Sequence, residues 1–135
     1  MTRWWEEPTA GEIVWCRFPD NIDPRPKPRP ALILVVFDDD APQFEVRVAY
    51  GTSKRTTTLY RGEFAILRDH NHAAYDAAGL SEDTKFDLKQ AIDLPFTAEW
   101  FSVPPQAPHG QTPRLGLLHP SLMRAVQAAF RAATK

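Results

Sequence analysis

Three cationic side chains occupy alternate positions of a proline-rich segment near the N-terminus. Arg25, Lys27 and Arg29 are separated by prolines, which stand at every second residue from Pro24 to Pro30. Proline restricts its own backbone and that of the preceding residue, so the backbone of each cationic residue is extended. Binding would therefore cost these residues little conformational entropy. The segment therefore indicates a site for an anion. A rigid connector that happens to be charged is the alternative interpretation.

A second polar segment, residues 51–58, combines hydroxyl groups with positive charge. Its sequence is Gly-Thr-Ser-Lys-Arg-Thr-Thr-Thr. Glycine lets the backbone turn sharply, which would leave the short donors Thr52 and Ser53 near the surface. Arg61 follows shortly after this segment. If the two clusters of cations meet, they form one electropositive floor, made by Arg25, Lys27 and Arg29 on one side and by Lys54, Arg55 and Arg61 on the other.

The surrounding sequence predicts short strands that position these segments. Residues 12–18 and 31–37 are rich in apolar, β-branched and aromatic residues, and residues 44–50 alternate between apolar and polar. Further strands are expected at 59–67, 84–88, 91–94, 99–103 and 114–118, with a polar loop at 104–113. A short helix is predicted over 69–79. A C-terminal helix follows His119, with an apolar stripe formed by Leu122, Met123, Val126, Ala129 and Phe130. We therefore expect a mainly β (α+β) fold, a small curled β-barrel with a C-terminal helix.

Length and composition are those of one globular domain. The chain has 135 residues, 43% hydrophobic and 24% charged, and residues 1–10 are expected to be a flexible lead-in. No apolar run approaches the length of a membrane span, the N-terminus lacks the apolar core of a secretory signal, and the single Cys16 is expected in the core. These features predict a cytoplasmic protein. A net charge of -1 argues against a generally basic nucleic-acid coat protein but allows a local basic site.

Three motifs resemble, in order and spacing, those of the PemK/MazF toxins of bacterial type II toxin-antitoxin systems, the mRNA interferases. Residues 11–15 (Gly-Glu-Ile-Val-Trp) are similar to that family's opening strand, and residues 29–31 (Arg-Pro-Ala) to the start of its second strand. Residues 48–53 (Val-Ala-Tyr-Gly-Thr-Ser) are similar to a strand that ends in Thr-Ser or Thr-Thr. Weaker similarity extends through 79–80, 84–88, 115–118 and the closing helix. The resemblance implies an SH3-like barrel, a homodimer, and a metal-independent endoribonuclease restrained by a cognate antitoxin.

The resemblance also implies roles for particular residues. Arg29 would stabilise the transition state, since its planar guanidinium can hold two phosphate oxygens and stays charged. Thr52, with Ser53 beside it, would position the scissile phosphate, and Asp87 is the candidate general base. Single-stranded RNA would be bound by Arg25, Lys27, Lys54, Arg55, Arg61 and Lys85. Cleavage would use no metal or cofactor and would leave 2′,3′-cyclic phosphate and 5′-hydroxyl ends.

Several alternatives stay open on the sequence alone. Lys85 and Asp87 could equally form an exposed ion pair of little energetic consequence. The serine that often follows the family's second apolar strand is absent, because Val35 and Val36 continue the run. The four histidines lack the spacing of a zinc site, and the loop around His109 could lie over the active site or be plain surface. The chain could also be a catalytically inactive binding module on the same barrel, or a toxin that acts on a protein target.

Overall fold

The computed structural model describes residues 7–19 and 27–134, in which six strands, two α-helices and one 3-10 turn are found. Their bounds, in chain order, are β1 (Glu12–Cys16), β2 (Arg29–Phe37), β3 (Glu45–Thr52), β4 (Glu63–Ile66), α1 (His72–Ala78), β5 (Thr84–Pro95), β6 (Arg114–Leu117), η1 (Pro120–Leu122) and α2 (Met123–Ala133). Residues 1–6 of the expected lead-in and residues 24–26 of the proline-rich segment, including Arg25, lie outside the described residues.

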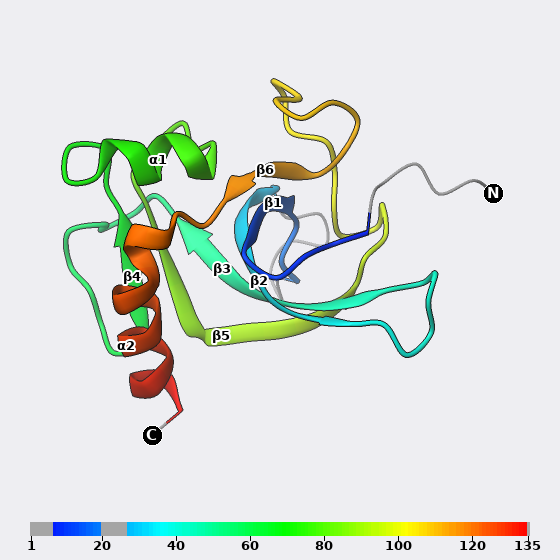
Figure 1. Ribbon diagram of the computed structural model, residues 1–135, viewed down its shortest axis with the longest axis horizontal. Helices are drawn as coiled ribbons and strands as arrows, with labels where there is room; N and C mark the ends of the chain where they lie inside the picture. The colour runs from blue at the N-terminus through cyan, green and yellow to red at the C-terminus, as the bar shows by residue number, and fades with distance from the viewer. Residues whose placement is uncertain (1–6, 20–26, 135) are drawn as a thin grey trace.

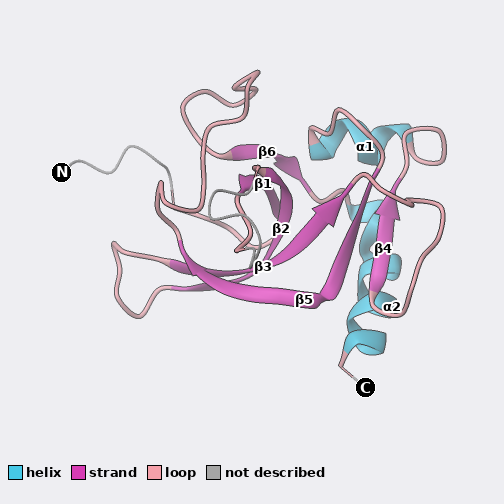
Figure 2. Cartoon of the chain, turned by 180° about the vertical axis from the view of Figure 1, so that it is seen from behind, coloured by secondary structure: helices cyan, strands magenta, loops and turns pink. Residues whose placement is uncertain are grey.

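The six strands form one antiparallel sheet in the order β4-β5-β3-β2-β1-β6. β3 and β5 are long and curved, and the sheet curls from β4 beside the helices round to β1 and β6 (Figures 1 and 2). Since β4 and β6 stand at opposite ends of this order, the sheet is a curled half-barrel. The prediction of a mainly β fold with a curled sheet and a C-terminal helix is confirmed at this level.

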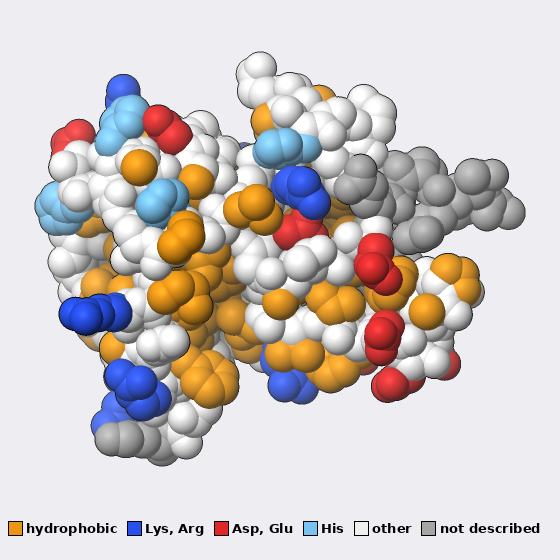
Figure 3. Space-filling view, viewed as in Figure 1, with side chains coloured by type: hydrophobic (Ala, Val, Ile, Leu, Met, Phe, Trp, Pro, Cys, Tyr) orange, Lys and Arg blue, Asp and Glu red, His pale blue; other side chains and the backbone are white. Residues whose placement is uncertain are grey.

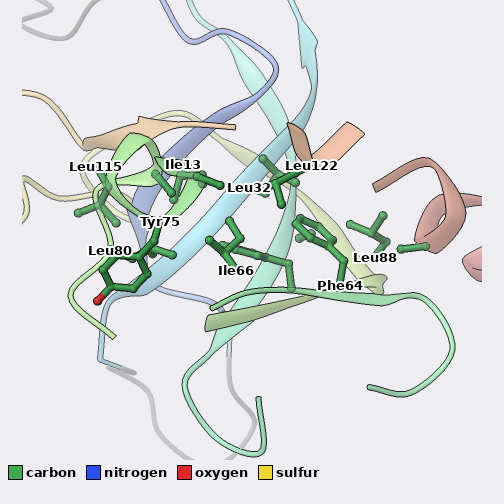
Figure 4. Close-up of a cluster of buried hydrophobic side chains, with 14 residues drawn as sticks. Ile13, Leu32, Phe64, Ile66, Tyr75, Leu80, Leu88, Leu115 and Leu122 are labelled. Carbon is green, nitrogen blue, oxygen red and sulfur yellow. The ribbon is translucent and has the colours of Figure 1, made fainter. Parts of the chain in front are cut away.

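The sheet buries side chains on both of its faces. On the face covered by the helices, Ile13 and Leu32 belong to a cluster with Phe64 and Phe86 (Figure 4). On the opposite face a second cluster contains Val14, Cys16, Ala31, Ile33, Val46, Val48, Leu94 and Phe101. Burial on both faces explains the apolar residues 31–33, whereas Val35, further along the same apolar run, is exposed.

The short helix follows its sequence signals. The Asn71 side chain caps α1 by accepting a hydrogen bond from the Ala74 backbone N–H at 3.1 Å. Gly79 ends the helix in the left-handed conformation, with a φ of 69°. The helix predicted over 69–79 is therefore confirmed, and it begins at His72.

The predicted apolar stripe of α2 is only partly buried. Leu122 and Ala129 are in the core, and Val126 packs against it. Met123 and Phe130 remain 43% and 56% exposed, so the prediction is wrong for these two. They lie to one side of the buried face of the helix, and hydrophobic side chains gather along α2 on the face shown in Figure 3.

Three strand predictions are corrected. Residues 84–88 and 91–94 belong to one strand, β5, which accommodates the intervening residues by a bulge opposite Ala49 and Tyr50. Residues 99–103 form no strand, because the Phe101 N–H bonds back to the Thr97 carbonyl in a turn, leaving one bridge to Cys16. β4 covers only the second half of 59–67. None of the described helices combines the length and the apolar character needed to cross a bilayer.

Candidate functional site

The end of β3 lies between β2 and β5, and this arrangement sets three polar residues in one row across the sheet. Ala31 of β2 pairs with Tyr50 of β3. Arg29, two residues before Ala31, therefore begins β2 at the end of this ladder where β3 ends with Thr52. On its other side Thr52 pairs with Lys85 of β5. We call Arg29, Thr52 and Lys85 the cross-strand row. Facing residues of antiparallel strands have Cβ atoms about 5 Å apart, which applies to Thr52 and Lys85.

Gly51 lets the three strands approach closely next to this row. A Cβ atom at this position would lie 2.5 Å from the Pro30 carbonyl oxygen and 2.8 Å from the Phe86 ring. A side chain here would therefore push β2 and β5 away from β3. Gly51 lies inside β3, so the sharp turn expected at this glycine is not found, and close packing accounts for it instead.

The Thr52 hydroxyl is oriented by the backbone that follows it. Its oxygen accepts a hydrogen bond from the Lys54 backbone N–H at 3.2 Å. Because a hydroxyl can accept and donate together, the Thr52 O–H can still donate to a bound anion. Ser53 follows directly after the end of β3 and is exposed. Thr52 and Ser53 thus lie at the end of β3, on the strand next to β2, which Arg29 begins.

Asp87 lies on the same face of the sheet as the row. It pairs with Tyr50 of β3, two residues along both strands from the pair of Thr52 and Lys85. Diagonal neighbours of this kind are about 7 Å apart. The carboxylate is half-buried, and its Oδ1 accepts from the Lys89 backbone N–H at 3.0 Å. Thr52 and Asp87 are therefore diagonal neighbours, and Arg29 belongs to β2, the strand on the other side of β3.

Lys85 is placed differently from either sequence interpretation. Its side chain is buried, with the residue 5% exposed, and its ammonium contacts Glu63 Oε1 at 3.0 Å and the Thr58 carbonyl oxygen at 2.8 Å. The same ammonium lies 5.0 Å from the centre of the Tyr60 ring. The alternative of an exposed ion pair with Asp87 is wrong, because Glu63 is the partner. Nor is Lys85 presented to solvent as a phosphate-binding cation.

The remaining cations are distributed around the row. Lys54, Arg55 and Arg61 are exposed in the segment between β3 and β4, and Lys27 is exposed just before β2. Arg29 is half-buried, and no other residue in the described ranges forms an ion pair or hydrogen bond with its guanidinium. Arg25 lies outside the described residues. The structure thus brings Arg29 to the segment that carries three of the predicted RNA-binding cations.

Cys16 faces Arg29 from β1 but is not available as a nucleophile. The two residues pair in the antiparallel ladder, and Cys16 has no exposed surface. Burial raises the pKa of its thiol to about 12, so the thiol is neutral at physiological pH. This confirms the prediction that Cys16 is a core residue. Within the described ranges, no group of three or more His, Cys, Asp or Glu side chains is placed to hold a metal ion.

A groove that sequence reasoning missed separates α2 from the segment around β4. Its volume is about 560 Å³, and Tyr60, Arg61, His70 and four alanines of α2 are among its lining residues. The sequence reasoning also missed Glu63, whose Oε1 accepts from the Tyr60 backbone N–H at 2.7 Å. The only local signal was the three-residue spacing of Tyr60 and Glu63, typical of a tight turn.

Comparison of this chain with models of protein families and with curated proteins finds no match.

Proposed function

We propose that this protein is an endoribonuclease of the PemK/MazF type that cleaves single-stranded RNA without a metal ion. The observation that supports the proposal is that Arg29 begins β2 at the end of the sheet where β3 ends with Thr52, with Asp87 a diagonal neighbour of Thr52 in β5. A guanidinium that forms no ion pair within residues 7–19 and 27–134 suits phosphodiester chemistry when it is combined with a hydroxyl donor and a carboxylate. The SH3-like barrel, the homodimer and the cognate antitoxin implied by the resemblance belong to the same proposal.

The reaction needs only these three groups, solvent water and the RNA itself. The ribose 2′-oxygen attacks the adjacent phosphorus while its proton passes to the Asp87 carboxylate. The bond from phosphorus to the 5′-oxygen breaks, and that oxygen takes a proton from a solvent water molecule to become a 5′-hydroxyl. The hydroxide left by the water is neutralised by the proton that Asp87 took up, which restores the carboxylate. Arg29 and the Thr52 hydroxyl stabilise the charge that develops on the non-bridging phosphate oxygens. The products are a 2′,3′-cyclic phosphate and a 5′-hydroxyl end.

The test is cleavage of a long RNA by purified protein in excess chelator, with the new ends mapped by primer extension. We expect discrete cuts with 5′-hydroxyl ends. Arg29→Ala should lower the cleavage rate by about 10²-fold to 10³-fold, the usual loss when one transition-state donor is removed. Arg29→Lys should recover little, since an ammonium lacks the two-pronged geometry of a guanidinium.

Arg47→Ala is the matched control. Arg47 is also a sheet arginine, but it is exposed and pairs with Asp93 at 2.7 Å toward the opposite end of β3. Arg47→Ala also removes one positive charge, but at a position away from the cross-strand row. It should therefore leave the cleavage rate unchanged. Equal activity of Arg29→Ala and Arg47→Ala would refute the role of Arg29. Intact RNA that nevertheless binds the wild-type protein would instead support an inactive binding module.

A further inference from the structure

A buried ammonium group holds the surface segment between β3 and β4 in place. The Lys85 ammonium contacts the Thr58 carbonyl and the Tyr60 ring within this segment. It also contacts the carboxylate of Glu63, the first residue of β4. Taking an ammonium and a carboxylate out of water costs several kcal/mol per ion, so such a pair is weak evidence for stability. What the contacts do provide is a fixed shape for residues 53–62.

The backbone of this segment is fixed by a second set of contacts. Glu63 Oε1 accepts from the Tyr60 N–H as well as from Lys85, and the Glu63 N–H donates to the Tyr60 carbonyl at 3.0 Å. Arg55 adopts a φ of 52°, an unfavourable conformation for a residue with a side chain, and its carbonyl accepts from the Thr58 N–H at 3.1 Å. The segment is therefore an ordered turn structure that begins at Thr52 of the candidate site.

Tyr60 is the exposed aromatic residue of this ordered segment. It is 56% exposed although its ring lies over the Lys85 ammonium, and it also lines the groove beside α2. Arg61 follows Tyr60 in the chain and is exposed, and Arg55 is an exposed arginine earlier in the same segment. Sites for single-stranded nucleic acid combine cations that follow the backbone with aromatic rings on which bases stack. A ring held from beneath loses little conformational freedom when a base stacks on it.

We propose that Tyr60 is a stacking surface for one nucleobase of single-stranded RNA, and that Lys85 and Glu63 are positioning residues which hold its ring. The proposal rests on the ribonuclease function proposed above and adds a binding subsite to it. Lys85 stands next to Thr52 in the cross-strand row and contacts Tyr60. The base recognised in this way therefore lies close to the scissile phosphate.

The first test measures binding of an uncleavable probe, a mixed-sequence single-stranded RNA with 2′-fluoro groups in place of the hydroxyls. Tyr60→Leu should raise its Kd by about 5-fold to 150-fold, the range for losing one stacked base. Tyr60→Phe keeps the ring and should bind like the wild type. Leu59→Ala is the control, because Leu59 is a neighbouring exposed apolar side chain, 51% exposed, without an aromatic face.

The second test removes the positioning pair without leaving a buried charge. Lys85→Met combined with Glu63→Leu should still fold, since apolar side chains can replace a buried ion pair without loss of stability. With the segment no longer held, Kd for the probe should rise as in Tyr60→Leu, and in cleavage KM should rise more than kcat falls. A purely structural role would instead change the unfolding midpoint and leave Kd unaltered.

The outcomes separate this inference from the function on which it rests. If the wild type binds and cleaves RNA but Tyr60→Leu and the double variant keep its Kd, the stacking role is overturned while the ribonuclease stands. If the wild type neither binds the probe nor cleaves RNA, both proposals are overturned. If Tyr60→Phe does not bind the probe, stacking is also contradicted. Such a result would mean that the phenol hydroxyl, and not the ring, contributes the affinity for RNA.

Discussion

At the scale of single residues, the surroundings of a cation decide its role more than its place in a motif. Arg29 begins β2 and Lys85 belongs to β5, the two strands that flank β3 and its last residue, Thr52. Among the described residues, none forms an ion pair or a side-chain hydrogen bond with the Arg29 guanidinium. The Lys85 ammonium, in contrast, contacts Glu63, Thr58 and Tyr60. The first is therefore free to meet a phosphate, and the second is occupied with holding protein structure.

The burial of Cys16 predicts how stability depends on alkaline pH. The folded protein keeps this thiol protonated up to a pKa of about 12, whereas in the unfolded chain it ionises near its usual value of 9.0. Between these values the unfolded state binds fewer protons, so the free energy of unfolding falls as the pH rises. From pH 8 to pH 10 this group alone should remove about 1.4 kcal/mol.

Urea unfolding at both pH values, for the wild type and Cys16→Ala, measures this contribution. Other groups that titrate in this range are common to both proteins and cancel in the comparison. The wild type should therefore lose about 1.4 kcal/mol more than Cys16→Ala over the interval. Equal losses in the two proteins would show that Cys16 is accessible to ionisation in the folded state.

At the scale of elements, the sequence predicted strands well where side-chain pattern and burial coincide. Residues 12–18 and 44–50 alternate between two faces, and Ile13 and Val14 do belong to opposite core clusters. The pattern failed at 99–103, where aromatic residues fold into a turn over one face. It also failed for Lys85, whose contacts with Thr58 and Glu63 span 27 and 22 residues. Such partners depend on strand order, which local pattern does not contain.

The junction of α1 with β6 gives a prediction about packing between elements. Gly79 ends α1 with a φ of 69°, and a Cβ atom there would meet the Leu115 carbonyl oxygen of β6 at 1.9 Å. Gly79→Ala therefore adds a backbone clash to the conformational cost of a side chain in the left-handed region. We expect a loss of roughly 2–4 kcal/mol in the free energy of unfolding.

Gly110→Ala separates these two costs. Gly110 has a φ of 84° but would place its Cβ atom in open space. Its substitution should therefore cost only about 1 kcal/mol, the conformational part. Denaturant unfolding of both variants tests the difference, and equal destabilisation would mean that α1 can move away from β6 without cost.

At the scale of the whole molecule, charge is separated along the β2-β3 hairpin. Three consecutive aspartates, Asp38 to Asp40, follow the end of β2 at the hairpin turn, whereas Arg29 and the segment after Thr52 occupy the other end. A strand of nine residues spans about 30 Å, several times the screening length of roughly 8 Å at physiological salt. A net charge of -1 is thus compatible with a locally positive site.

This separation predicts a strong salt dependence of RNA binding despite the nearly neutral chain. If Arg29, Lys54, Arg55 and Arg61 each neutralise one phosphate, log Kobs should fall with log salt with a slope of about -3, because each contact with a single strand contributes roughly -0.7. Arg55→Ala should reduce the slope by about 0.7, and Arg47→Ala, at the other end of β3, should leave it unchanged. Titration of the 2′-fluoro probe at several salt concentrations measures all three slopes. A wild-type slope near zero would contradict a backbone-tracking site, since it would mean that RNA affinity does not depend on releasing counterions from its phosphates.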